Sequence, residues 1–458
     1  MNTSTDPRKI MDETEMTTAM MIVVAITVFL NAMDGFDVLA ISFASPGIAA
    51  EWGISNTALG FVLSAELVGM AIGSIFLGGV ADKMGRRQTL LGCLVVMSLG
   101  MFLATTATSP IILCIWRVLT GLGIGGMLSC TNATVAEFSN NRWRSLCISL
   151  MVIGYPLGGV FGGDIAQRWL LPNYDWRSVF YFGSAVTGAL IPVVYFLVPE
   201  SVHWLARKQP VNALDKINAS LAKLGKASIA QLPEVNEEEM KKSVGDIFSK
   251  GLIMITLIVT AAYFLHITTF YFILKWTPKI VADMGFEAAL AGGVLKWANI
   301  GGALGGATFG ILTARFGLKP LTISILVLTM IGVSAFGRTD ADIGQMQMLA
   351  AIAGFFGNAG VSGLYSIVAY SFPTHVRATG TGFVIGVGRA GAVLAPILAG
   401  VLFDADKGLP VVAMVLGSGS LLAAIVLIFL KMETSKPQEV SIAESEPNAE
   451  GMGVSAAT

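Results

Sequence analysis

The sequence predicts an all-α integral membrane protein whose twelve transmembrane helices form two six-helix repeats. Apolar residues make up 54% of the 458 positions and charged residues only 13%, whereas a soluble domain has about 25% charged residues. The 52 glycines suit helices that pack closely in lipid. The net charge of −1 gives no reason to expect a nucleic acid partner.

The apolar runs have the length of membrane spans, because about 20 helical residues cross the hydrocarbon core. The four cysteines lie in or beside these runs and are interpreted as packing residues rather than disulfides or metal ligands. We predict spans at residues 19–42, 57–80, 88–107, 110–135, 145–168, 177–198, 251–274, 288–313, 320–337, 345–370, 379–402 and 410–431.

A polar stretch separates the first six spans from the last six and contains a predicted short helix within Val211 to Leu224. Most of the 29 Lys and Arg residues fall on the side of this linker and of both termini. The positive-inside rule therefore predicts a multi-pass protein of a bacterial-type inner membrane, with both termini cytoplasmic. The expected parts are a tail (1–18), a first bundle (19–198), a linker (199–250), a second bundle (251–431) and a tail (432–458).

The two halves carry an internal repeat. The segment Gly78-Gly-Val-Ala-Asp-Lys-Met-Gly-Arg-Arg after span two recurs 232 positions later as Gly310-Ile-Leu-Thr-Ala-Arg-Phe-Gly-Leu-Lys. Ile153-Gly154 recurs at the same offset as Ile385-Gly386. Parallel six-helix repeats are typical of carriers whose halves rock around a site near the membrane midplane.

The residue types in the repeated loop each indicate a structural role. A glycine such as Gly78 lets a neighbouring helix approach, Gly85 permits a tight turn, and Asp82 can accept bonds at a helix N-terminus. A plain positively charged anchor would explain the basic residues but not this combination. We expect gating contacts from Gly78, Asp82, Lys83, Gly85, Arg86 and Arg87, and from Glu137, Arg144, Arg315 and Arg377 on the same side.

Acidic residues inside the spans are the first functional candidates. Asp34 and Asp37 share one face of span one, and a carboxylate in the hydrocarbon costs at least about 2.5 kcal/mol. Because desolvation favours the neutral form of a carboxyl group, both are candidate proton carriers, with Asp37 expected to be the more solvated. Arg117 cannot lose its charge and is expected to pair with these aspartates, and Glu66 is a lower-ranked coupling candidate.

These segments together resemble the major facilitator superfamily. The loop after span two resembles its signature loop, and Arg117 to Gly126, Asp175-Trp-Arg and Pro199-Glu-Ser agree with further motifs. Asp34-Gly-Phe-Asp narrows the resemblance to its aromatic acid:proton symporter family. The likeness covers nearly the whole chain except the tails. Ala314 stands where the first loop has an aspartate, so we expect an asymmetric gate.

Arg389 is the leading candidate for binding a substrate carboxylate. Its neighbours Gly388 and Gly391 have no side chains and so leave room around the guanidinium. The planar guanidinium can bind a carboxylate through two parallel hydrogen bonds. The resemblance also implies an arginine at this position. Alternatives stay open: Lys296 could instead partner an aspartate, His266 could be a packing residue, and Tyr271, which could stack on a planar ligand, could belong to an interfacial belt. The other candidate substrate contacts are Lys296, Asn299, Trp297, Phe36, Tyr155, His266 and Tyr365.

The resemblance implies a proton-coupled secondary transporter that imports an aromatic carboxylate by alternating access, with the lipid bilayer as its surroundings. No cofactor or metal is expected, and no nucleophile–base pattern indicates an enzyme. The protein is expected to act as a monomer. The alternatives are a proton-coupled exporter of drugs or organic cations, a carrier of a non-aromatic organic acid, and a membrane receptor.

Overall fold

The protein is described by a computed structural model that covers residues 6–233, 247–249, 251–372 and 376–430, without the side chains at 78, 314 and 377–379. Twelve long helices occur in this part of the chain, and eleven meet the length and apolarity of a membrane span. The first six are α2 (Thr18–Trp52), α3 (Asn56–Met84), α4 (Arg86–Thr105), α5 (Pro110–Glu137), α6 (Arg144–Ile165) and α7 (Arg177–Leu197). The last six are α10 (Ile253–Asp283), α11 (Ala288–Phe316), α12 (Leu318–Phe336), α13 (Ile343–Ser371), α14 (Arg377–Asp404) and α15 (Leu409–Ile428).

Local chemistry sets many of the helix ends. The Ser55 hydroxyl accepts the Ala58 N–H at the start of α3, and Ser109 caps α5 ahead of a proline. Gly53, with φ of 57°, ends α2 in the left-handed conformation. Gly85 and Gly317 hold φ of 104° and 76° in the two copies of the repeated loop, so the predicted tight turn is confirmed in both.

Two predicted spans are too short. Span one was expected to end at residue 42 and span seven at residue 274, but α2 continues to Trp52 and α10 to Asp283. The predicted spans stop at Ser42 and just before Lys275, yet both of these polar residues are fully buried within their helices. Counting apolar residues misses a helix that buries its polar residues against protein.

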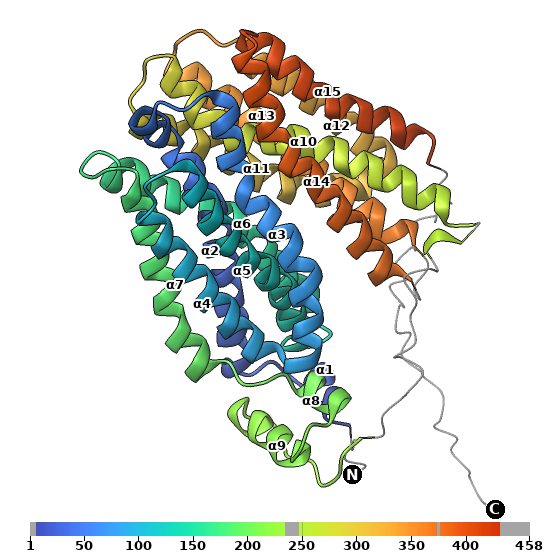
Figure 1. Ribbon diagram of the computed structural model, residues 1–458. Coiled ribbons are helices and arrows are strands. Elements are labelled where there is room, and N and C mark those ends of the chain that lie inside the picture. The colour runs from blue at the N-terminus through green and yellow to red at the C-terminus, as the bar shows by residue number, and fades with distance from the viewer. Residues whose placement is uncertain (1–5, 234–246, 250, 373–375, 431–458) are drawn as a thin grey trace, which may run out of the picture.

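The repeat seen in the sequence is present in the packing. In the first half α2 packs on α6, α3 on α5, and α4 on α5 and α7. In the second half α10 packs on α14, α11 on α13, and α12 on α13 and α15, which are the equivalent pairs. Figure 1 shows the two groups of helices side by side, blue to green and yellow to red. The halves meet through α3 with α14, α6 with α11, and α2 with α10.

Short helices mark one end of the first half. They are α1 (Pro7–Glu13), α8 (Val202–Lys208) and α9 (Ala213–Lys223), at the bottom of Figure 1. We call this the linker end and the opposite end, with the α2–α3 and α14–α15 turns, the far end. The surface helix predicted in the linker is confirmed as α9, whereas α1 was not expected. The backbone carbonyl of Asp12 in α1 accepts a hydrogen bond from the Asn141 N–H, and its carboxylate pairs with the Arg144 guanidinium.

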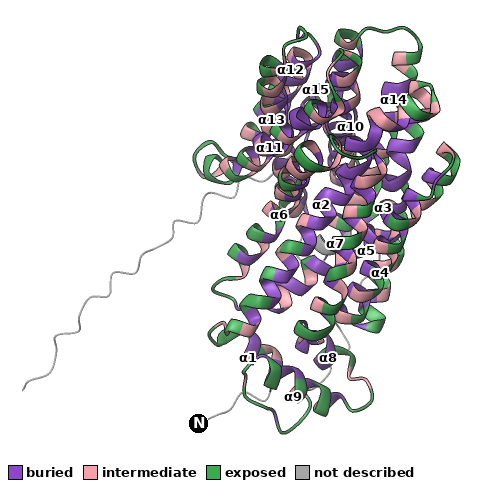
Figure 2. Ribbon diagram, turned by 90° about the vertical axis from the view of Figure 1, so that its left-hand side faces the viewer, coloured by how far each residue is buried: buried purple, intermediate pink, exposed green. Residues whose placement is uncertain are grey.

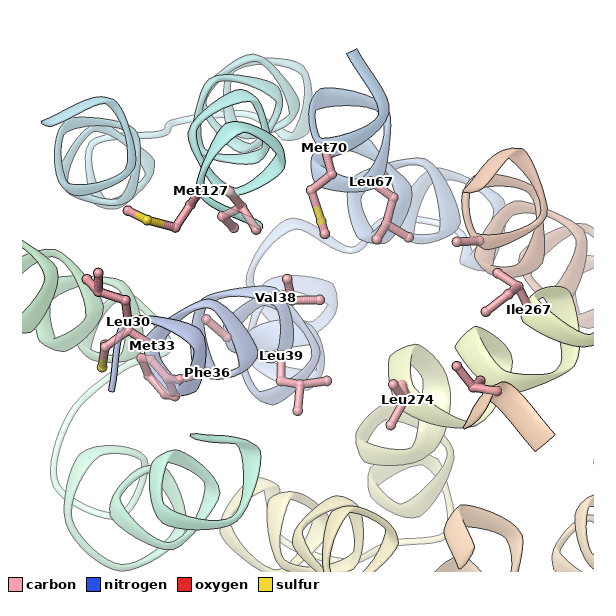
Figure 3. Packing of buried hydrophobic residues seen from close by; sticks show 14 of the residues in the cluster. Leu30, Met33, Phe36, Val38, Leu39, Leu67, Met70, Met127, Ile267 and Leu274 are labelled. Carbon is pink, nitrogen blue, oxygen red and sulfur yellow. The ribbon is translucent and has the colours of Figure 1, made fainter. Parts of the chain in front are cut away.

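The core lies where helices from both halves meet. Figure 2 shows buried residues concentrated on facing helix surfaces and exposed residues on the outer faces. Val38 and Leu39 of α2, Leu67 of α3 and Leu274 of α10 are all buried, and Figure 3 shows them around the junction of these helices. This junction encloses the charged residues described below.

Close helix contacts in the first half depend on glycines. A Cβ atom at Gly158 of α6 would overlap the backbone of Ala32 on α2, whereas one at Gly92 of α4 would meet nothing within 4 Å. We expect Gly158→Val to destabilise the protein by about 1–3 kcal/mol, because overpacking forces the helices apart. Thermal unfolding in detergent measures this, with Gly92→Val as the matched control. Equal melting temperatures for the two variants would contradict the packing argument.

Candidate functional site

Three carboxyl groups lie buried in the first half, and one of them, Glu66, faces the second half. Asp34 and Asp37 of α2 and Glu66 of α3 each have no exposed surface. Neither carboxyl oxygen of Asp34 has a hydrogen-bond partner among the described residues. Oδ2 of Asp37 accepts a bond from the Thr187 hydroxyl at 3.3 Å. The expectation that Asp37 is more solvated than Asp34 is therefore wrong, because α2 continues beyond Asp37 and stays covered.

Two buried cations face these acids. Arg117 Nη2 lies 2.5 Å from Glu66 Oε1, and Lys275 Nζ lies 3.5 Å from Glu66 Oε2. Arg117 also donates to the Asp37 carbonyl at 2.9 Å and covers the Phe180 ring. Lys275 also donates to the Val38 carbonyl. Removing Glu66 would leave both cations without their ion-pair partner, whereas removing one cation would leave Glu66 with the other alone.

The partner predicted for Arg117 is wrong in detail. Its ion pair is with Glu66 rather than with the side chain of Asp34 or Asp37, and it reaches α2 through a backbone carbonyl. Sequence spacing placed these residues in neighbouring spans but carried no information on which acid the guanidinium would face. Glu66, ranked below the aspartates from the sequence, is the acid that joins both cations.

Lys275 was missed in the sequence because the predicted span ended one residue before it. The signal was present: Lys275 interrupts an apolar run that resumes at Trp276, and a lysine at such a depth is a functional hypothesis by default. In the structure it has no exposed surface. It belongs to the second half, while both of its partners belong to the first.

Arg389 lies between the halves, on α14. Its Nη1 donates to the Met70 carbonyl at 3.2 Å and to the Ser74 hydroxyl on α3. Its Nε and Nη2 donate to no residue of the described chain and are not among the buried unpaired atoms. A Cβ at Gly386, on the same side of α14, would meet nothing within 4 Å. One side of the guanidinium is thus held by α3, and its other donors remain available.

Tyrosines surround this arginine. Tyr263 and Tyr271 of α10 both interact electrostatically with Arg389. The Tyr263 hydroxyl donates to the Tyr365 hydroxyl at 3.2 Å, with ring centroids 5.6 Å apart. Tyr155, from α6 of the first half, interacts with Tyr271. Tyr155, Tyr271 and Tyr365 were among the aromatic residues considered from the sequence, whereas Tyr263 completes the group only in three dimensions.

Other predicted substrate contacts lie elsewhere. Trp297 is 40% exposed and lines a groove on the outer face of α11 and α13. His266 is buried inside the second half, between Ser420 and the Gly357 carbonyl at 2.9 Å each. Phe36 packs edge-on against Phe182 within the first half. For His266 the packing alternative is confirmed. Trp297 and Phe36 make these contacts instead of contacts with the Arg389 group, because helical periodicity alone does not tell which face of a helix points to the interface.

The far end holds the halves together. Lys296 of α11 pairs with Asp164 of α6 at 2.8 Å, so the aspartate alternative for this lysine is confirmed. Asp404 at the end of α14 accepts the Asn56 and Thr57 N–H groups at the start of α3, at 2.9 and 2.8 Å. Asn299 of α11 is buried against Gly159 of α6. Lys296 and Asn299 therefore belong to the closed far end.

The ion pairs at the linker end stay within the first half and its appended helices. Arg86 bonds Asp82 at 3.1 Å and Glu137 at 3.0 Å, and Asp82 also bonds Arg207 at 2.9 Å. Among the described residues, no ion pair joins the halves here. Arg144 pairs with Asp12, and Arg315 lies exposed over Phe316. The surroundings of Gly78 and the side chain of Arg377, two further predicted gating residues, lie outside what the structure describes.

Glu200, in the Pro-Glu-Ser segment after span six, binds backbone N–H groups at the start of α4. Its Oε1 accepts the N–H groups of Arg86, Arg87 and Ser201 at 2.7–3.2 Å. The carboxylate thereby caps the start of α4 directly after Gly85. Burial raises the pKa of Glu200 above its ordinary value, although the three N–H donors act in the opposite direction.

This geometry provides a charged group that includes the pair of Glu66 with Lys275 between the halves, an arginine open on one side, a closed far end, and a linker end at which no ion pair of the described residues joins the halves. In the described part of the chain, no three His, Cys, Asp or Glu side chains form a candidate metal site. Contacts between the halves at the far end are typical of a carrier with that end closed rather than of a catalytic centre.

Comparison with known proteins supports the family resemblance found in the sequence. The model of the Major Facilitator Superfamily matches residues 24–308 and 278–452. The gallate transporter of Pseudomonas putida is 30% identical, covering 86% of this chain and 88% of the relative. The 4-hydroxybenzoate transporter PcaK of the same species is 30% identical, covering 81% and 84%.

A solved structure has the same fold. The xylose transporter XylE from E. coli, in a partially occluded inward open conformation, gives a TM-score of 0.70 at 17% identity over 92% of this chain and 100% of that one. At this identity the likeness concerns the fold alone. The family model and the curated relatives show that the chain is a multi-pass membrane transporter and not an enzyme. It belongs to the major facilitator superfamily, within the aromatic acid:proton symporter family.

Proposed function

We propose that this protein imports an aromatic carboxylate together with protons by alternating access. The observation that carries the proposal is the pairing of two features at the junction of the halves. Arg389 offers free donors among tyrosines, and the buried Glu66 interacts electrostatically with Tyr271, as Arg389 does. The first suits a planar aromatic acid and the second suits protons.

The substrate site is built around Arg389. Its planar fork can bind a carboxylate through two parallel hydrogen bonds. Tyr263, Tyr271 and Tyr365 supply ring faces and hydroxyls beside it, and aromatic pairs add about 0.5–1.5 kcal/mol beyond area burial. The relatives' substrates, gallate and 4-hydroxybenzoate, have this combination of a carboxylate and a hydroxylated ring.

The protons bind at Asp34, Asp37 or Glu66. Asp34 is fully buried without a hydrogen-bond partner in the described chain, and an isolated buried carboxylate takes up a proton rather than keep its charge. One proton moving with a monoanion carries no net charge. A second proton would add about 2.3 kcal/mol per 100 mV of membrane potential.

The linker end faces the cytoplasm of an inner membrane in this proposal, because Lys and Arg residues concentrate there. The far end is held by Lys296–Asp164 and by Asp404 on α3. The described conformation is then the inward-open one, in which substrate and proton leave toward the cytoplasm. The outward-open state requires these contacts to separate.

A competition experiment tests the substrate class. Purified protein in liposomes should exchange labelled 4-hydroxybenzoate across the membrane at equal pH on both sides. We expect unlabelled benzoate and gallate to compete, cyclohexanecarboxylate to compete weakly, and organic cations such as tetraphenylphosphonium not to compete. Competition by cations but not by acids would overturn the proposal in favour of a cation exporter.

A further inference from the structure

We propose that Lys275 is a moving counter-charge, which drives proton release to the linker side when the far end closes. This inference rests on the proposed proton-coupled transport and deepens it by naming the residue that ties proton affinity to conformation. Lys275 is a positioning residue in this sense. It acts on the carboxyl groups and need not touch the transported acid.

Lys275 reaches across the boundary between the halves. It projects from α10 of the second half, and its ammonium group contacts the Glu66 carboxylate on α3 and the Val38 carbonyl on α2 of the first half. The side chain has no exposed surface. When the far end opens, α10 moves away from α2 and α3, so these two contacts must break while the pair between Arg117 and Glu66 within the first half can persist.

When Lys275 moves away, the balance of charges around the buried acids changes. Within the first half, Glu66 pairs with Arg117, Asp37 interacts electrostatically with Arg117, and Asp34 interacts with both acids. Lys275 adds the second positive charge from the other half. The group therefore holds three acids and two cations in the described state, and three acids and one cation after the halves separate. The other titratable groups nearby are Tyr155, Tyr271, Tyr263, Tyr365 and Arg389.

A nearby positive charge favours the ionised form of a carboxyl group, and its removal favours the protonated form. With Lys275 withdrawn, the group formed by Asp34, Asp37 and Glu66 accepts a proton from water on the far side. When Lys275 returns, its charge displaces that proton, which leaves to water on the linker side. Only an O–H bond of a carboxyl group forms and breaks, and the lysine keeps its charge throughout.

Transport assays separate this role from simple packing. Lys275→Gln should still exchange labelled 4-hydroxybenzoate at equal pH, but should not accumulate it under a pH gradient. Raising the internal pH by about one to three units should restore its net uptake, because that is the range over which a neighbouring charge shifts a carboxyl group. Lys275→Arg should accumulate normally. Lys279→Gln is the matched control one turn along α10, where Lys279 pairs with Asp283.

A second readout needs no substrate. Spin labels at Thr108 and Asp340, exposed in far-end loops of the two halves, report the opening of the far end by electron resonance distance measurement. In the unsubstituted protein the open population should rise as pH falls, since the open state binds the proton more tightly. In Lys275→Gln this pH dependence should vanish, because a ligand with equal affinity for both states shifts neither.

The outcomes are separable. Wild-type protein that exchanges none of the acids tested would refute the proposed substrate class, while the distance measurement would still decide the role of Lys275. A Lys275→Gln protein with wild-type accumulation, or with wild-type pH dependence of opening, would overturn the inference. If that variant fails to fold, the double variant Glu66→Gln with Lys275→Gln removes both charges together. It should open independently of pH, and a wild-type response would again overturn the inference.

Discussion

Arg389→Ala is expected to weaken binding of the aromatic acid by about 30-fold to several thousand-fold, which corresponds to about 2–5 kcal/mol for losing one partner of a hydrogen-bonded charge pair. The arginine is held on α3 by Met70 and Ser74, so its free donors are already oriented. Exchange of labelled 4-hydroxybenzoate and equilibrium binding in detergent measure the loss.

Two variants sharpen this result. Arg389→Lys keeps the charge but lacks the planar fork, so it should bind with intermediate affinity. Arg338→Ala is the control, because Arg338 lies exposed at the far end against Ser334 and Met414. Unchanged affinity in Arg389→Ala, with normal folding, would remove Arg389 as the carboxylate anchor.

Arg117→Met is expected to abolish transport and to destabilise the protein by about 3–5 kcal/mol, the usual cost of breaking a buried ion pair by removing one partner. The variant would leave Glu66 with Lys275 alone, at 3.5 Å. It would also remove the bonds to the Asp37 carbonyl and to the Met101 sulfur. Thermal unfolding in detergent measures the loss of stability.

A double-mutant cycle isolates the ion pair. Arg117→Met combined with Glu66→Gln removes both charges, so it should recover part of the lost stability but no accumulation of substrate. Arg168→Met is the control, since Arg168 pairs with Asp164 near the surface. Additive effects of the two single substitutions would show that the pair between Arg117 and Glu66 contributes no coupling energy.

The architecture could be predicted from the sequence because it depends on patterns that survive without coordinates. Twelve apolar runs, a polar linker and the repeated loop with Gly85 and Gly317 predicted two six-helix halves. Each pattern reflects a local constraint, such as the length needed to cross the bilayer or the positive φ that a tight turn requires.

The site was less predictable because it depends on which helix faces meet. Asp34, Glu66, Arg117 and Arg389 stood out as charges inside apolar runs. Glu66 and Arg389 contact the opposite half, and Asp34 and Arg117 are buried in the first half near Glu66. Their partners did not follow from spacing: Arg117 pairs with Glu66 rather than with an aspartate of α2.

Errors ran in both directions. Trp297 looked like a substrate contact beside Lys296, but it points to the outer face of α11. Lys275 looked like the first residue after a span, but it is buried inside α10. Rotation about a helix axis and the true end of a helix are both set by tertiary packing, which a hydropathy pattern does not contain.

Proton-driven accumulation is the central claim, and one measurement tests it most directly. Liposomes that contain the protein and have an alkaline interior receive labelled 4-hydroxybenzoate, and protein-free liposomes subtract diffusion of the neutral acid. We expect accumulation above the external concentration, a matching rise in external pH, and loss of both with a protonophore or in Asp34→Asn. Protein-dependent uptake that only equilibrates the acid and ignores the pH gradient would contradict proton coupling.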